Sequence, residues 1–207
     1  MNNENQNQDQ KPMTDYEASV VVADMMGKLL PNKGDGMEFK IPVVPAVLRK
    51  EGKGRITDMN CHCVYRGDDD KLVFRDMNYR SKMPLAFLNA KESEDFMETV
   101  KQESEESINR YKDGKAMRNA IVERVTTPTA RHFTHDQADT IRRYLGSFDD
   151  PQERDARASY VWNEAKDAGD FGRYPEKWEK DALKEFNDIK NGLTNGQEEN
   201  RHAHVRL

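Results

Sequence analysis

The sequence predicts an α+β protein with a small antiparallel β-meander backed by an N-terminal helix, a long acidic helical arm, and a C-terminal three-helix bundle. Three observations predict this fold. Residues 55–78 contain two strand-like runs joined by a polar turn at Gly67–Asp70. Residues 92–126 show a narrow apolar seam among many charged side chains, which is typical of a largely exposed helix. Beyond residue 132, three segments begin with residues that favour helix starts.

Changes of composition along the chain predict its domain organisation. We expect a disordered tail at 1–13, a sheet domain at 14–91, the helical arm at 92–126, the bundle at 132–193 and a loose tail at 194–207. The first 13 residues are rich in Asn and Gln and contain no aromatic or branched aliphatic side chain. Such a segment buries too little apolar surface to offset the entropy lost on ordering.

The N-terminal helix is predicted to begin after Thr14, because Glu17 follows it at capping-box spacing. Its apolar side chains are expected to form one face that packs on the sheet. The residues assigned to that face are Tyr16, Val20, Val21, Met25, Leu29 and Leu30.

Three strands are expected in the meander. The first lies within residues 37–50, where Pro42 and Pro45 favour a sheet edge or a polyproline segment, because proline has no N–H to donate. The other two are the halves of the 55–78 hairpin, each taken as one continuous strand.

The arm is expected to begin at Asn89, which has Glu92 at capping-box spacing, and to break or kink at Asp113-Gly114. The bundle helices are predicted to start at Thr134, Asp150 and Pro175 and to end near Gly146, Gly169 and Gly192. Each start has a capping side chain or a proline suited to the first turn, and each end is a glycine.

The overall composition is polar for a chain of 207 residues, with 35% hydrophobic and 34% charged residues and a mean hydropathy of −1.02. The sequence contains no apolar run of about 20 residues, as a membrane span requires. Its N-terminus lacks the basic start and apolar core of a secretory signal, and its two cysteines form no disulfide framework. We therefore expect a cytoplasmic protein without a membrane partner.

Two groups of residues carry metal-ligand chemistry. The first is Cys61-His62-Cys63, and the second is His132 with His135. Structural zinc sites usually pair their ligands at Cys-x₂₋₄-Cys, whereas alternation along a strand would bury both cysteines and point His62 the other way. We therefore predict buried cysteines without a metal or a cofactor.

No catalytic residues are predicted. The acidic cluster Asp68-Asp69-Asp70 lies in an expected turn, where solvent would keep the carboxylates alike, whereas catalytic pairs need environments that separate their pKa values. The sequence contains neither a Gly-x-Ser-x-Gly elbow nor a Walker-type loop. A metal-dependent hydrolase that uses His135 and Asp136 remains an alternative.

Charge is unevenly distributed along the chain, whose net charge is −5 and whose pI is near 5.6. Residues 38–91 hold eleven basic and seven acidic side chains, whereas residues 92–107 hold seven acidic side chains and one basic. The candidate partner- or nucleic-acid-binding residues on the basic sheet are Arg49, Lys53, Arg55, Arg66, Arg75 and Arg80. The candidate acidic docking face consists of Glu94, Glu98 and Glu105.

These observations favour a non-enzymatic accessory or inhibitory protein that acts by recognising another protein. Its general character fits a phage or plasmid product directed at host or defence machinery. A single-stranded nucleic-acid-binding module is the main alternative, with bases stacking on Tyr65, Phe74 and Tyr79 of the basic sheet. The acidic pI disfavours that alternative. A homodimer is compatible with the acidic arm.

Overall fold

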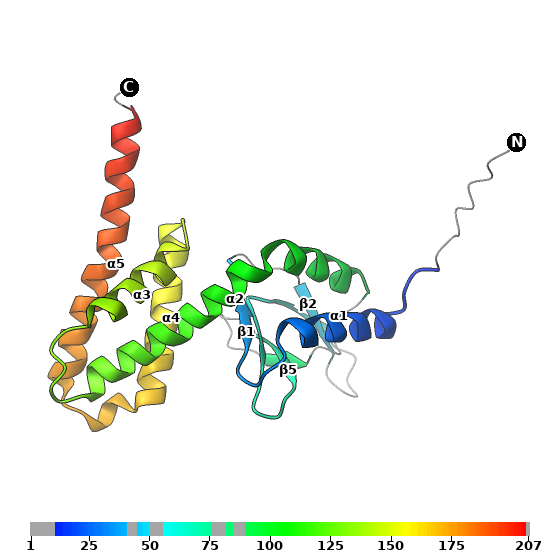
Figure 1. The fold of residues 1–207 in the computed structure, drawn as a ribbon, viewed down its shortest axis with the longest axis horizontal. Coiled ribbons are helices and arrows are strands. Elements are labelled where there is room, and N and C mark those ends of the chain that lie inside the picture. Colours follow the sequence, from blue (N-terminus) through cyan, green and yellow to red (C-terminus); the bar gives the residue numbers. More distant parts are fainter. Residues whose placement is uncertain (1–10, 41–44, 50–55, 76–81, 85–89, 206–207) are drawn as a thin grey trace, which may run out of the picture. The chain divides into compact units, whose positions relative to one another are not determined.

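The structure is a computed structural model that describes residues 11–40, 45–49, 56–75, 82–84 and 90–205. It shows an α+β protein with a helical majority (Figure 1). The chain forms two compact units. The sheet unit consists of Met1–Asp35 and Ile41–Ser104, and the helical unit consists of Gly36–Lys40 and Glu105–Leu207. This division differs from the predicted one, because the helical arm is shared and residues 36–40 join the helical unit.

Helix α1 (Asp15–Leu29) begins with the predicted capping box. The Glu17 amide donates to Thr14 Oγ1 at 3.2 Å, and the Thr14 amide donates to Glu17 Oε2 at 2.9 Å. The predicted buried face is wrong for three of its six members. The helix buries Ala18, Val22 and Met26, which lie four residues apart and therefore form one line along it.

Tyr16, Val20 and Val21 are exposed instead. Apolar residues occur on more than one side of this helix, and periodicity alone does not show which of these sides is buried. Of the remaining predicted members, Leu30 is buried, while Met25 and Leu29 are partly exposed.

The sheet unit contains two separate groups of antiparallel strands. Strands β4 (Cys63–Arg66), β5 (Leu72–Arg75) and β6 (Lys82–Pro84) form a meander, with Val64 opposite Phe74 and Phe74 opposite Met83. Strands β2 (Pro45–Arg49) and β3 (Ile56–Asn60) form a hairpin of their own.

The prediction of one continuous strand over 55–66 is wrong. The chain leaves the strand at Cys61 and His62, so that β3 pairs with β2 and β4 pairs with β5. His62 is buried together with both cysteines, and the expected alternation of faces does not hold across the break. The predicted turn is confirmed, since the Asp70 amide donates to the Gly67 carbonyl at 3.0 Å.

Helix α2 (Ala90–Thr126) runs for 37 residues without interruption. The predicted cap, Asn89, lies outside the described residues. The Ala90 amide donates to Asp15 Oδ1 at 2.9 Å. In the sheet unit, Phe96 of α2 packs edge-on against Phe74, with ring centroids 5.3 Å apart. This contact joins the helix to the meander.

The predicted break at Gly114 is wrong. A Cβ at Gly114 would lie 3.1 Å from the Tyr144 ring and 3.2 Å from Glu38 Oε2. Glycine therefore serves close packing inside a continuous helix rather than a turn.

Helices α3 (His135–Gly146), α4 (Pro151–Gly169) and α5 (Glu176–Val205) form the rest of the helical unit, with a short 3₁₀ turn η2 (Phe171–Arg173) between α4 and α5 (Figure 1). The predicted starts of α3 and α4 are confirmed by side-chain caps from Thr134 and Asp150. Helix α5 does not end at Gly192 as predicted but continues to Val205, through the segment expected to be a loose tail.

One apolar core holds the helical unit together. Besides residues from α3, α4 and α5, it contains Met117, Ile121 and Val125 from the C-terminal half of α2. The predicted three-helix bundle thus packs with a fourth helix. Trp162 belongs to this core, and the centroid of its ring lies 5.4 Å from that of Phe186 and 6.1 Å from that of Phe171.

Candidate functional site

Two residues of the predicted basic face, Arg66 and Arg75, have described side chains, and both make contacts within the chain. Arg66 Nε donates to the Leu30 carbonyl at 2.7 Å, and Arg66 Nη1 donates to the Asp70 carbonyl at 2.7 Å. Arg75 is half-buried and lies over the ring of Tyr65, 5.8 Å from its centroid. Lys53, Arg55, Arg80 and the side chain of Arg49 lie outside what the structure describes.

The predicted acidic face lies on α2, where Glu94, Glu98 and Glu105 are all exposed. Glu94 and Glu98 are four residues apart in the sheet unit and share one side of the helix. Glu105 belongs to the part of α2 in the helical unit.

The candidate metal ligands are not brought together. His132 Nδ1 lies 2.8 Å from Glu185 Oε2, and His135 Nε2 lies 3.3 Å from Asp139 Oδ2. Cys61 and Cys63 are buried, and the Cys61 thiol donates to the Cys63 carbonyl at 3.5 Å. Within the described part of the chain, no group of three or more His, Cys, Asp or Glu residues is placed to hold a metal ion.

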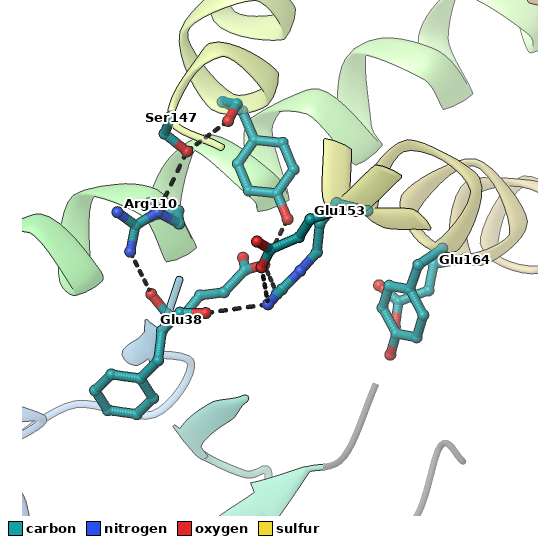
Figure 2. Close-up of polar contacts among 9 residues, drawn as sticks. Glu38, Arg110, Ser147, Glu153 and Glu164 are labelled. Carbon is teal, nitrogen blue, oxygen red and sulfur yellow. Dashed lines mark hydrogen bonds and ion pairs between the residues drawn. The ribbon is translucent and has the colours of Figure 1, made fainter. Parts of the chain in front are cut away.

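A buried polar network around Glu38 was not predicted from the sequence (Figure 2). Glu38 ends strand β1 (Gly36–Glu38) in the helical unit. Its Oε1 accepts a hydrogen bond from the Tyr144 hydroxyl at 2.6 Å and from Arg157 Nη1 at 2.5 Å. Glu38 is 6% exposed and Arg157 is 4% exposed, so this ion pair is shielded from solvent.

Further contacts fix the backbone on either side of Glu38. Figure 2 shows Arg110 between Glu38 and Ser147: its Nη1 donates to the Glu38 carbonyl at 2.9 Å, and its Nε donates to Ser147 Oγ at 3.2 Å. Arg157 Nη2 donates to the Phe39 carbonyl at 3.1 Å. Together these contacts dock the segment 36–40 on α2, α3 and α4.

Two features at the ends of this segment complete the docking. A Cβ at Gly36 would lie 2.5 Å from the Tyr111 ring, so only glycine allows this approach. Lys40 Nζ lies 2.6 Å from Asp149 Oδ2. The hydrogen bond from Lys40, and then its charge, lower the pKa of Asp149.

The chemistry of the network favours a structural role. Both charges of the Glu38–Arg157 pair meet protein partners, as buried ion pairs require. The cavity lined by residues 124–132 and 177–188 includes no member of the network. The contacts of Glu38 hold the segment 36–40 in place.

An exposed apolar stripe on α1 and the residue before its cap is the feature that points to recognition. Within the described residues, the large hydrophobic side chains that are exposed all gather here: Met13, Tyr16, Val20 and Val21, with Tyr16 79% exposed. We call these four residues the α1 stripe. Large apolar side chains gathered on one exposed surface mark interaction sites in soluble proteins.

Charged side chains flank the α1 stripe. Asp15, Glu17 and Asp24 are acidic, and Lys28 is the one base of the described helix. Lys28 Nζ lies 3.0 Å from Asp24 Oδ2 and offsets its charge. The charged side chains that flank the α1 stripe are therefore mostly acidic.

Comparison with known proteins adds no family: no family model, no curated protein and no solved structure matches the chain. Among the described helices, none is long and apolar enough to cross a membrane.

Proposed function

We propose that this protein is a non-enzymatic binding protein that recognises a protein partner through the α1 stripe. The observation that carries the proposal is the exposure of Tyr16, Val20 and Val21 on a helix that already buries its opposite side through Ala18, Val22 and Met26. A helix that needed only to cover the sheet would carry polar residues on its outer side.

The spacing of the stripe supports the binding of α1 as a helix in a groove. Tyr16 and Val20 are four residues apart on α1, the spacing by which a helix inserts anchors into an apolar groove, and Met13 precedes the cap of the helix. With 15 residues, α1 is about 22 Å long at 1.5 Å per residue. The expected partner presents an apolar groove of similar length.

Charge favours a different protein over a second copy of this chain. Pairing two α1 helices face to face would bring together acidic flanks, each with three carboxylates and one lysine. Like charges brought together across an interface cost free energy, whereas a basic rim on the partner would attract this surface. The partner is therefore a protein whose groove is apolar inside and basic at its edge.

Site-specific cross-linking of the full chain in its native host tests this proposal. A photoreactive phenylalanine replaces Tyr16 in one variant and Asp68 in a matched control, because Asp68 is also exposed in the sheet unit. We expect a cross-link to one protein from position 16 and not from position 68. The captured protein is then purified, and its affinity for wild type is compared with that for Y16D and V20D.

The expected result is a loss of affinity of about tenfold or more in each variant, since each buries a charge in an apolar contact. Circular dichroism should show an unchanged fold, because both side chains face solvent. A cross-link to a second copy of the chain would overturn the proposal, as would full affinity in Y16D or cross-linking to nucleic acid.

A further inference from the structure

A surface cavity of about 660 Å³ lies in the helical unit between the end of α2, the loop that follows it, and the first half of α5. The α5 residues on its wall recur at helical spacing along one side of the helix. They are Lys177, Trp178, Asp181, Lys184, Glu185 and Asp188. From the first to the last they span about 16 Å at 1.5 Å per residue. The cavity is thus elongated along α5.

The wall opposite α5 is held in place by two charged side chains. Arg124 is 5% exposed and donates to the Ala130 carbonyl at 3.0 Å and to the Arg131 carbonyl at 2.7 Å. Glu185 accepts from the Phe133 amide at 2.5 Å, and its other oxygen lies 2.8 Å from His132 Nδ1. The loop is therefore fixed before any ligand arrives, which lowers the entropy cost of binding.

Five charged side chains on the wall form no ion pair within the described structure. Three are positive and two are negative: Arg131, Lys177 and Lys184, and Asp181 and Asp188. Arg124 Nε, which is buried, has no hydrogen-bond acceptor in the described structure and lies 3.7 Å from Glu185 Oε1, with which it forms an ion pair.

Charges elsewhere on α5 do find partners. Lys180 pairs with Glu176 at 3.2 Å, Lys190 with Asp155 at 3.2 Å, and Glu179 with Lys166 at 3.1 Å. Unpaired charge is concentrated where α5 faces the cavity.

The order of these five charges bears on the ligand chemistry. Among those on α5, the signs alternate from Lys177 to Asp181, Lys184 and Asp188, while Glu185 between the last two is bonded to the loop. The steps of four, three and four residues correspond to about 6, 4.5 and 6 Å. Same-side residues of an extended peptide are about 6.6 Å apart. A simple anion would meet two carboxylates here, and a simple cation would meet two lysines.

We propose that this cavity binds an extended segment of a protein partner whose side chains on one side alternate between acidic and basic. The inference rests on the proposed function in that the ligand is a protein, but it concerns a surface other than the α1 stripe. Trp178, half-buried and 6.2 Å from the Tyr174 ring, offers an apolar platform for the stem of a bound lysine.

Fluorescence polarisation with synthetic peptides and the purified full chain tests this inference. The probe is labelled Glu-Thr-Lys-Thr-Glu-Thr-Lys, together with its reversed sequence, because threonine favours an extended chain. The control Glu-Thr-Glu-Thr-Lys-Thr-Lys has the same composition with the charges in blocks. Peptides with four Glu or four Lys in place of the alternating charges complete the set.

We expect the better alternating peptide to bind about tenfold more tightly than the block peptide at low salt, because four opposite charges then face one another. K184E should weaken binding about tenfold, whereas K180E, on the same helix but outside the cavity, should not. The Y16D variant should bind the alternating peptide as tightly as wild type does. The peptide test therefore does not depend on whether the α1 stripe binds a partner.

Three outcomes would overturn the inference. The first is the absence of binding by either alternating peptide at concentrations up to about 1 mM. The second is binding of the all-acidic, all-basic or block peptide as tightly as the alternating one. The third is equal weakening by K180E and K184E, which would indicate general attraction between charges and not a site.

Discussion

Glu38 Oε1 lies 2.5 Å from Arg157 Nη1, and the two residues are separated by 119 positions in the sequence. The pair joins an extended segment that precedes β2 to the middle of α4. Tyr144 and Arg110 reinforce the same junction through the carboxylate and carbonyl of Glu38. Five residues from an early part of the chain, 36–40, therefore belong to the helical unit. The stability of this unit depends on their contacts with α2, α3 and α4.

Removing one charge of this pair should strongly destabilise the helical unit. In E38A the Arg157 guanidinium stays buried without its carboxylate, which costs about 3–5 kcal/mol in the free energy of unfolding. Urea unfolding followed by tryptophan fluorescence measures the effect, because both tryptophans, Trp162 and Trp178, belong to the helical unit.

The double variant E38L/R157M provides the control. It replaces both charges with apolar side chains of similar length, and we expect it to recover much of the stability lost in E38A. An E38A variant as stable as wild type would contradict the role assigned to the pair.

Helix starts could be predicted from the sequence because their contacts are local. The caps at Thr14 and Thr134 join residues three apart, so the pattern and the contact lie in the same few letters. The Glu38 network could not be predicted in this way, since its partners lie 72 to 119 residues away. In the sequence Glu38 appears only as a charge at the edge of an apolar run.

Long-range packing also explains the errors. Gly114 resembles a helix break by local rules, but it lies within α2 at a point where a Cβ would be 3.1 Å from the Tyr144 ring. Tyr16, Val20 and Val21 are predicted to be buried because periodicity locates an apolar side of a helix without showing which side meets the rest of the protein. The cavity escaped detection because a loop and α5, more than 40 residues apart in sequence, form its two walls.

Two glycines in helices should respond oppositely to substitution by alanine. At Gly114 the added Cβ would lie 3.1 Å from the Tyr144 ring and 3.2 Å from Glu38 Oε2. We expect G114A to lower the free energy of unfolding, because displacement of a tightly held ring outweighs a gain in helix propensity of about 1 kcal/mol.

Gly192 is the matched control, since a Cβ there would meet no atom within 4 Å. G192A should raise stability by about 0.5–1 kcal/mol, because alanine loses less backbone entropy than glycine on entering a helix. Urea unfolding of both variants measures the difference. Equal stabilisation by the two substitutions would show that the space around Gly114 is not restrictive.

The Lys40–Asp149 pair should make docking of the 36–40 segment depend on pH. Lys40 lowers the pKa of Asp149 from its ordinary value of 3.8, first through the hydrogen bond and then through its charge. Because the folded pKa is the lower one, the stabilisation is fully present above the unfolded value and is lost as pH falls through the folded value. We therefore expect D149N to be less stable than wild type at pH 7, with the difference shrinking as the pH falls below 3.8 toward pH 2. K40M should remove the same pH-dependent difference, and D149N should have no further effect in the K40M background.

Salt of about 0.5 M should shrink the stability difference between D149N and wild type, since the Lys40–Asp149 pair is exposed to solvent. Urea unfolding at the two pH values measures it, and a stability difference that persists unchanged at pH 2 would show that Asp149 acts through something other than its charge.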